Sequence, residues 1–265
     1  LSYAYDHEWI NKTIYQNAYV RTDSYFDNSP LASSGLPSKN ELELLNVWKD
    51  EIPAEVFTET FIPPITDGSG NDRKNLLKAK EILEKEGWFV EDGKLVKDGK
   101  EFKFEFLIVS PSDEKIALAY QSNLKKLGIT MDVRTVDSSQ YQERLLSYDF
   151  DMIKRYWGVS LSPGNEQQFY WGSEVGQKDG SRNYPGINSP AVDALIEKLI
   201  SATNREELTT AIHALDRVLL WGHYVVPLYH SNKDRIAYWD FFEYPDEIPL
   251  YGIVIESWWI NKDKQ

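Results

Sequence analysis

Residues 101–136 read EFKFEFLIVSPSDEKIALAYQSNLKKLGITMDVRTV, and their pattern of apolar side chains decides the fold class. The first residues alternate phenylalanine with polar side chains and lead into an apolar run, as a strand entering a core does. The next apolar residues recur at helical spacing, with Ser112 as a candidate N-terminal cap and Gly128 where a helix ends in a left-handed conformation. Residues 129–136 alternate again. This strand, helix, strand order predicts two parallel strands with a right-handed crossover in an α/β sheet.

Other elements are predicted on both sides of this unit. A charged amphipathic helix at 72–86 is stopped by Gly87, and two Asp-Gly turns between residues 88 and 110 indicate a hairpin. Four further helices are predicted: a short one at 41–48, a short one with Ser139 and Gln142 as its capping box, one beginning at Ser189 and Pro190, and one with Thr203 and Glu206 as its capping box. Two further strands are predicted at 150–157 and 225–230. Together they predict a mixed sheet flanked by helices.

Composition excludes several classes of function. The chain has 265 residues, 29 Lys and Arg against 42 Asp and Glu, and a net charge of -13. Its charges are interspersed, so nucleic acid, which needs a concentrated basic face, is not an expected partner. It contains no Cys, which excludes disulfides and thiolate metal sites.

The first residues read as a helix already in progress. Apolar residues at positions 1, 4, 5, 10 and 14 suggest a helical stripe with no capping residue ahead of it. This pattern predicts that the chain begins partway through a larger protein.

No motif for catalysis or metal binding stands out. The four histidines lack the spacing of a metal-binding helix face, and no nucleophile-elbow, phosphate-loop or dinucleotide pattern occurs. Asp149 with Asp151, and Glu166 with Glu174, are better explained as a solvated acidic surface than as a catalytic pair. We expect no catalytic residue, no metal and no cofactor.

Residues 155–173, RYWGVSLSPGNEQQFYWGS, combine flat aromatic side chains with neutral polar ones, and GSRNYPG follows at 180–186. This mixture is typical of a ligand-binding cleft, where aromatics supply area and amides and hydroxyls supply hydrogen bonds. Some of these aromatics are expected simply to pack beneath a long loop. The predicted ligand-binding residues are Tyr156, Trp157, Ser160, Asn165, Trp171, Arg182 and Asn183.

Several ordered motifs carry a resemblance to a known family. They are LSYAYDHEWINKTIY (1–15), SPGNEQ (162–167), WGS (171–173), GSRNYPGINSPAVDALI (180–196) and VVPLY (225–229). In this order they resemble the family 5 extracellular solute-binding proteins of bacterial ABC importers, and most of all their oligopeptide and microcin C-binding branch.

The resemblance implies one lobe of a two-lobed periplasmic-binding-protein fold of type II. Residues 1–225 would form the second ligand-binding lobe, and residues 226–265 would cross the hinge and return to pack on a first lobe that this sequence lacks. The implied protein is a monomer, periplasmic or lipid-anchored outside the cell.

The implied function is binding rather than catalysis. The ligand would be an oligopeptide or peptide conjugate, captured between the lobes and delivered to ABC permease subunits in the membrane. In peptide-binding relatives an acidic residue three positions after the corresponding Trp pairs with the peptide amine. Here Ser160 stands three positions after Trp157, and Glu166 is an alternative carboxylate.

The residues alone leave two alternatives to a peptide receptor open. A carbohydrate-active or carbohydrate-binding protein would also use Trp and Tyr, because these side chains stack on sugars, and the chain has nine Trp. A partner-binding domain would use the aromatic segment as an interface patch.

Overall fold

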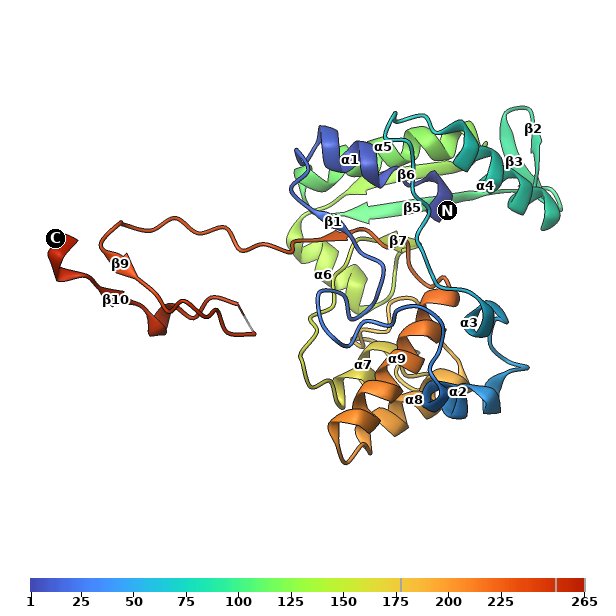
Figure 1. Cartoon of the computed structure of the whole chain (residues 1–265). Coiled ribbons are helices and arrows are strands. Elements are labelled where there is room, and N and C mark those ends of the chain that lie inside the picture. The colour runs from blue at the N-terminus through green and yellow to red at the C-terminus, as the bar shows by residue number, and fades with distance from the viewer. Residues whose placement is uncertain (177, 251, 265) are drawn as a thin grey trace.

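The computed structural model describes residues 1–176, 178–250 and 252–264. An upper layer of sheet and helices lies over a lower layer of helices, and the C-terminal residues extend away from both as an arm (Figure 1). Each layer has its own apolar core. The mixed α/β class is therefore as predicted.

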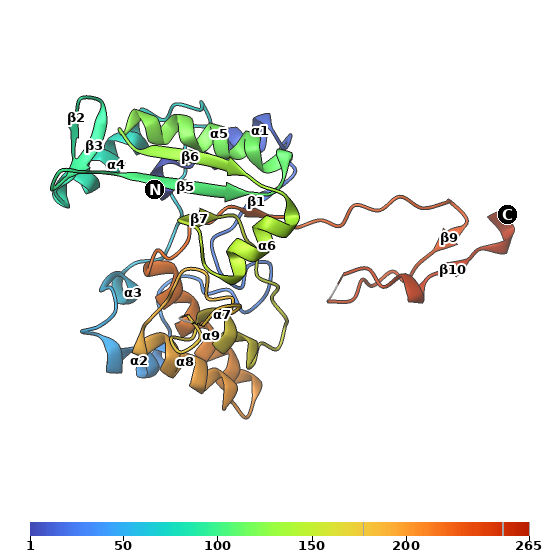
Figure 2. The ribbon, with the colours of Figure 1, turned by 180° about the vertical axis from the view of Figure 1, so that it is seen from behind.

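The predicted strand, helix, strand unit is confirmed as β5 (Lys103–Ile108), α5 (Pro111–Lys126) and β6 (Thr130–Thr135). The two strands pair in parallel, and β7 (Met152–Ile153) adds a third parallel strand on the other edge of β5. Figure 2 shows α5 and α1 (His7–Thr13) on one side of this sheet and the helical layer on the other.

Three predicted helix starts were wrong by one or two residues. Ser110 rather than Ser112 caps α5, and Asp137 rather than Ser139 caps α6 (Ser138–Leu146). Asn204 rather than Thr203 caps α9 (Arg205–Trp221). In each case another residue with a short polar side chain lies nearby, and the backbone geometry selects between them.

The predicted helix in progress at residue 1 was also wrong. Helix α1 begins at His7, and the side chain of Asp6 caps it by accepting a hydrogen bond from the Trp9 backbone nitrogen at 2.9 Å. Ala4 and Tyr5 are buried ahead of this helix, next to a short 3-10 turn at Ser2–Ala4. Tyr5 packs edge to face on Tyr120 of α5, so tertiary packing rather than helical periodicity explains the apolar residues.

The predicted hairpin is a three-stranded antiparallel meander beside α4 (Arg73–Lys85). Its strands are β2 (Phe89–Glu91), β3 (Lys94–Lys97) and β4 (Lys100–Glu101). Both Asp-Gly turns have positive φ at both residues, as tight hairpin turns require.

Gly128 joins this meander to the parallel sheet. Its φ is +79°, its carbonyl accepts from the Leu95 backbone nitrogen at 2.7 Å, and an added Cβ would lie 2.8 Å from that same nitrogen. We expect Gly128→Ala to lower the free energy of unfolding by about 1–2 kcal/mol, because both the backbone conformation and the contact are unfavourable. Gly93→Ala is the control, since Gly93 has the same φ with nothing within 4 Å. Urea unfolding measures the free energy of unfolding of both variants. Equal losses of this free energy would contradict a role for the close approach of Gly128 to the Leu95 backbone nitrogen.

The lower layer is built on two antiparallel helices, α8 (Pro190–Ile200) and α9. Ser189 caps α8 as predicted, by accepting from the Val192 backbone nitrogen. The smaller helices of this layer are α2 (Lys39–Leu45), α3 (Glu55–Thr58) and α7 (Glu166–Trp171).

A buried ion pair fastens α2 to α9. Arg217 Nε donates to Glu41 Oε2 at 2.6 Å, His213 Nδ1 lies 3.7 Å from Glu41 Oε1, and the Glu41 and Arg217 residues are each 4% exposed. Burial alone would raise the pKa of Glu41, but the adjacent His213 imidazole and the Arg217 hydrogen bond outweigh it and lower this pKa to about 2. The adjacent Glu41 carboxylate raises the pKa of His213.

This ion pair predicts a stability maximum in mildly acidic solution. Glu41 contributes stability above its usual pKa of 4.5, and that contribution is lost as pH falls toward 2. His213 contributes below its usual pKa of 6.5 and loses its contribution as pH rises through its raised pKa. Thermal unfolding from pH 2 to 8 should show both limbs, and Glu41→Gln should flatten the acidic one. If Tm falls with falling pH as steeply in that variant as in the wild type, protonation of Glu41 is not the cause of the acidic limb.

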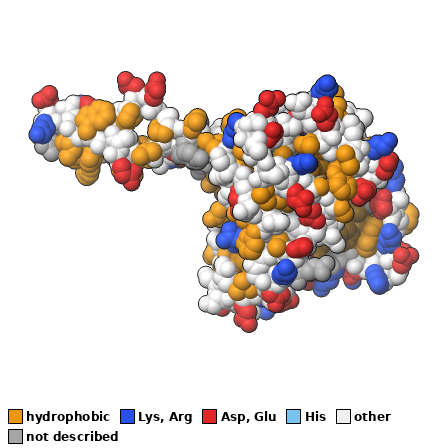
Figure 3. Space-filling model, turned by 90° about the horizontal axis from the view of Figure 1, so that it is seen from below, with side chains coloured by type: hydrophobic (Ala, Val, Ile, Leu, Met, Phe, Trp, Pro, Cys, Tyr) orange, Lys and Arg blue, Asp and Glu red, His pale blue; other side chains and the backbone are white. Residues whose placement is uncertain are grey.

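Strands β1 (Val20–Arg21) and β8 (Tyr229–His230) pair where the chain passes into the arm. Beyond β8 the arm carries a small hairpin of β9 (Phe242–Glu243) and β10 (Trp259–Ile260) and an aromatic cluster of Tyr238, Tyr244 and Trp258. Apolar and charged side chains alternate over its surface (Figure 3), and Leu250 is 91% exposed.

Candidate functional site

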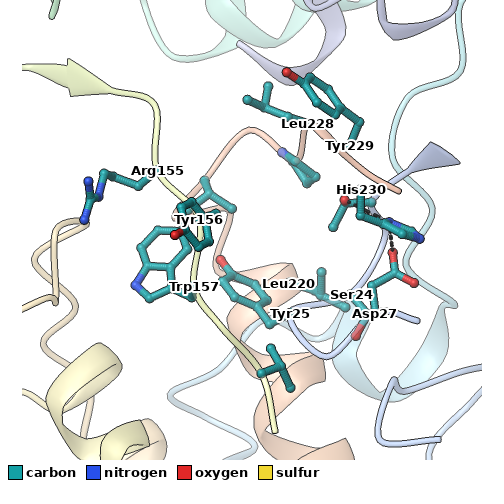
Figure 4. Close-up of a pocket in the computed structure, with 14 residues that line it drawn as sticks. Ser24, Tyr25, Asp27, Arg155, Tyr156, Trp157, Leu220, Leu228, Tyr229 and His230 are labelled. Atoms are coloured by element: carbon teal, nitrogen blue, oxygen red, sulfur yellow. Dashed lines mark hydrogen bonds and ion pairs between the residues drawn. The ribbon is translucent and has the colours of Figure 1, made fainter. Parts of the chain in front are cut away.

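A hollow of about 230 Å³ lies where three chain segments pass between the two layers. One segment descends from β1 into the lower core, one leads from β7 toward α7, and one rises from the end of α9 to β8. We call it the crossing hollow (Figure 4). Its lining residues are Thr22, Ser24, Tyr25, Asp27, Arg155, Tyr156, Trp157, Val159, Leu220, Val225, Pro227, Leu228, Tyr229 and His230.

The aromatic wall of the crossing hollow is backed by Trp171. Trp157 packs on Trp171 with ring centroids 4.8 Å apart, and Tyr25 meets Trp171 edge to face at 5.0 Å. Trp157 Nε1 donates to the Arg182 carbonyl at 3.4 Å, while Trp171 Nε1 donates to Gln167 Oε1 at 3.0 Å. Both indole nitrogens are therefore satisfied, which leaves the Trp157 ring as a fixed apolar surface.

The opposite edge of the hollow is polar. His230 Nδ1 lies 3.3 Å from Asp27 Oδ2 and 3.3 Å from Thr22 Oγ1. Figure 4 shows Asp27 and His230 together at this edge, across the hollow from Trp157. Next to them, burial and the charge of Asp27 raise the pKa of Asp23. The hollow thus offers an aromatic side and an acidic side.

Asp216 of α9 holds the first segment in place from below. It is fully buried, and its carboxylate accepts from Ser24 Oγ and the Tyr25 backbone nitrogen, both at 2.8 Å, and from the backbone nitrogen and hydroxyl of Ser33 at 2.9 and 2.7 Å. Burial raises the pKa of this carboxyl, and the four hydrogen bonds oppose that rise. Tyr25 therefore sits on a rigid support.

Of the seven predicted ligand-binding residues, the structure brings Tyr156 and Trp157 into the wall of the hollow. Tyr156 is 86% exposed. Ser160 and Arg182 are exposed outside the lining, and Asn165 lines a different surface hollow with Phe169.

The side chains of the predicted residues Trp171 and Asn183 are enclosed by the fold. Trp171 is 2% exposed and Asn183 is 0% exposed. Asn183 Nδ2 donates to the carbonyls of Gly172 and Ile187 at 3.0 and 2.8 Å, and its Oδ1 accepts from the Ile187 nitrogen at 2.8 Å. These two residues support the loop beneath the wall.

Three of the four carboxylates considered in the sequence have partners close by, and the fourth, Glu174, lines the hollow that contains Asn165. Glu166 accepts through both oxygens from the Gly164 backbone nitrogen, at 2.9 and 3.1 Å. Asp149 pairs with Arg144, and Asp151 accepts from the Glu105 backbone nitrogen. Within the described ranges, no three His, Asp or Glu side chains gather as a metal site would require. Across the same part of the chain, no helix is both long and apolar enough for a membrane span.

Sequence reasoning did not predict the lining residues of two segments, the one that follows β1 and the one between α9 and β8. Tyr25 and Asp27 lie in a turn-rich stretch that carried no recognisable motif, and Leu228 and His230 were assigned only to a crossing strand. The co-occurrence of Tyr, Phe and Asp with Ser in SYFDNS (24–29) was the one available signal.

Known proteins resemble the chain along most of its length. The family model for bacterial extracellular solute-binding proteins, family 5 (middle part), matches residues 1–179. A protein named y4wM from Sinorhizobium fredii is 49% identical over 98% of this chain and 40% of its own length. The probable peptide-binding protein YejA of Agrobacterium fabrum is 42% identical over 99% of this chain and 43% of its own. The chain thus spans about two-fifths of the length of these relatives.

Among solved structures, the oligopeptide-binding protein AppA of Bacillus subtilis, in complex with a nonapeptide, superposes with a TM-score of 0.65 at 22% identity. That match covers 98% of this chain and 46% of AppA. It shows that the fold is the α/β fold of the type II periplasmic binding proteins. The chain belongs to the bacterial extracellular solute-binding proteins of family 5.

Proposed function

We propose that this chain provides part of the substrate-binding component of an ABC transporter, which captures peptides or peptide-like solutes and delivers them to a membrane permease. The crossing hollow carries the proposal, because it joins an aromatic wall to polar groups where segments from both layers meet. The Agrobacterium relative and AppA are both named as peptide-binding proteins, which supports a peptide ligand over the carbohydrate alternative.

We also propose that residues 1–225 act as one lobe and that residues 226–265 cross the hinge and pack on a first lobe. The exposed apolar side chains of the arm support this division, since Trp239 is 73% and Ile255 is 70% exposed. Ligand would hold the lobes together, and the permease would recognise the closed form.

The hollow is proposed as a binding site without a catalytic step. Asp27 is paired with His230, and its two oxygens also accept from the backbone nitrogens of Asp23 and Asn28 at 3.0 and 2.7 Å. The family is one of binding proteins described as extracellular, which supports a periplasmic or lipid-anchored location. We propose a monomer as the working form.

Native mass spectrometry of the full-length protein, purified without refolding from its own periplasm, tests this function. We expect carried masses that fragment as peptides or peptide conjugates, and an equimolar pool of two- to eight-residue peptides should exchange with them. Carried glycans would favour the carbohydrate alternative. Empty protein that retains no peptide from the pool would contradict the proposal.

A further inference from the structure

Tyr148 ends helix α6 in a backbone conformation that usually belongs to glycine. Its φ is +56°, and the Asp149 backbone nitrogen donates to the Arg144 carbonyl at 2.9 Å, which is the hydrogen bond of a Schellman helix end. Helices α4 and α5 end with the same bond, but the left-handed residues there are Gly87 at +83° and Gly128 at +79°. A bulky side chain is unfavourable in this conformation, and a position that breaks such a local rule often serves a function.

The Tyr148 side chain contacts the 180–184 loop at two points. Its hydroxyl is hydrogen-bonded to Ser181 Oγ, and its ring packs against the Tyr184 ring with centroids 6.1 Å apart. Ser181 is 5% exposed, and its Oγ also accepts from the Asn183 backbone nitrogen at 3.4 Å. The tyrosine therefore fixes the loop through a buried hydroxyl and through a ring.

The 180–184 loop in turn holds two residues that line the crossing hollow. Trp157 Nε1 donates to the Arg182 carbonyl at 3.4 Å, and the Trp157 ring lies 6.3 Å from the Tyr184 ring between centroids. The Arg155 guanidinium lies over the Tyr184 ring at 5.2 Å. Because Trp157 and Arg155 both belong to the lining, a shift of the loop would move two parts of the wall.

We propose that Tyr148 is a positioning residue for the wall of the crossing hollow, because it holds the 180–184 loop that fixes the indole of Trp157. Tyr148 does not line the hollow, so it acts only through these contacts. Its effect on ligand binding rests on the proposed function, whereas its effect on Trp157 rests on the contacts alone. A glycine would suit the helix end better but would lose both contacts with the loop.

Tyr148→Gly tests the placement of Trp157 without any ligand, because it removes the side chain and the unfavourable backbone conformation together. Full-length protein labelled with ¹⁵N-tryptophan gives an indole N–H signal for each Trp, and the Trp157 signal is the one that disappears in Trp157→Phe. We expect Tyr148→Gly to shift or broaden this signal. Its Tm should fall by less than about 4 °C, since the relaxed backbone offsets the lost ring contacts.

Peptide affinity tests the consequence for the hollow, with the peptide that the wild type retains most strongly from the pool as the probe. We expect Tyr148→Gly to bind this peptide about 10-fold more weakly. Tyr148→Phe keeps the ring contact and loses only the hydrogen bond to Ser181, so it should bind about 3-fold more weakly.

Asp98→Gly is the matched control. Asp98 is also left-handed, with φ +51°, but it lies in the turn between β3 and β4 of the meander. Its replacement should leave both the Trp157 signal and the affinity at their wild-type values.

Three results would overturn the inference. They are an unchanged Trp157 signal or an unchanged affinity in Tyr148→Gly, a larger fall in its Tm, which would mean that the tyrosine serves stability, and an equal change of signal in Asp98→Gly. Failure of the wild type to retain any peptide would instead contradict the proposed function, and the Trp157 signal would still decide whether Tyr148 positions the wall.

Discussion

Asp216→Ala is expected to lower the free energy of unfolding by about 3–5 kcal/mol, the range for removing the acceptor of a buried polar network. The carboxylate is fully buried and accepts four hydrogen bonds from Ser24, Tyr25 and Ser33. Alanine leaves these donors without partners and leaves a cavity between α9 and this segment. Because the three donors belong to the segment that forms one side of the crossing hollow, the variant should also bind peptide more weakly.

Urea unfolding followed by far-ultraviolet circular dichroism measures this loss. Asp240→Ala is the control, since the Asp240 side chain is 99% exposed and its loss should change the free energy of unfolding by less than about 0.5 kcal/mol. A loss below about 1 kcal/mol at Asp216 would mean that water reaches Ser24 and Ser33 and that the carboxylate is not the support of this segment.

Local patterns in the sequence predicted the main elements but not all of their ends, and they missed the short helices α3 and α7. The strand, helix, strand unit at 101–136 was predictable because the periods of its strands and helix, and the glycine that ends the helix, all agree. Helix starts were less certain, since Ser110 and Ser112 are both competent caps and only the three-dimensional path of the chain distinguishes them.

The candidate site was only partly predictable, because its wall is assembled from segments about 130 and 70 residues apart in sequence. Trp157 and Trp171 look alike in a local pattern, yet one lines the hollow and the other lies behind it. Asn183 resembles a ligand-binding amide, but its side chain makes three hydrogen bonds to the backbone of its own loop.

Burial and hydrogen bonding separate the residues that support the wall of the hollow from those that line it. Asp216, Trp171 and Asn183 are buried and fully engaged, so substitutions there act first on stability. Trp157 lines the hollow and is only half-buried, so its ring faces the hollow on one side. Substitutions there should act first on binding, and the two classes can be told apart by measuring Tm and affinity on the same variants.

Trp157→Ala should weaken binding of the retained peptide by at least about 30-fold, equivalent to about 2 kcal/mol, as expected for an aromatic anchor in a binding pocket. The indole is held on Trp171 at 4.8 Å and by the hydrogen bond to the Arg182 carbonyl, so it offers area to a ligand at little entropic cost. Trp157→Phe keeps a flat ring on Trp171 and should lose less than half of that free energy.

Phe169→Ala separates this effect from a general loss of aromatic surface. Phe169 is 40% exposed on α7, but it lines the other hollow with Asn165 rather than the crossing hollow. Isothermal titration calorimetry should therefore give the wild-type affinity for Phe169→Ala and the large loss only for Trp157→Ala. If both variants lose affinity equally, the peptide contacts the outer face of the 155–173 segment, and the crossing hollow is then not the site that the ligand occupies.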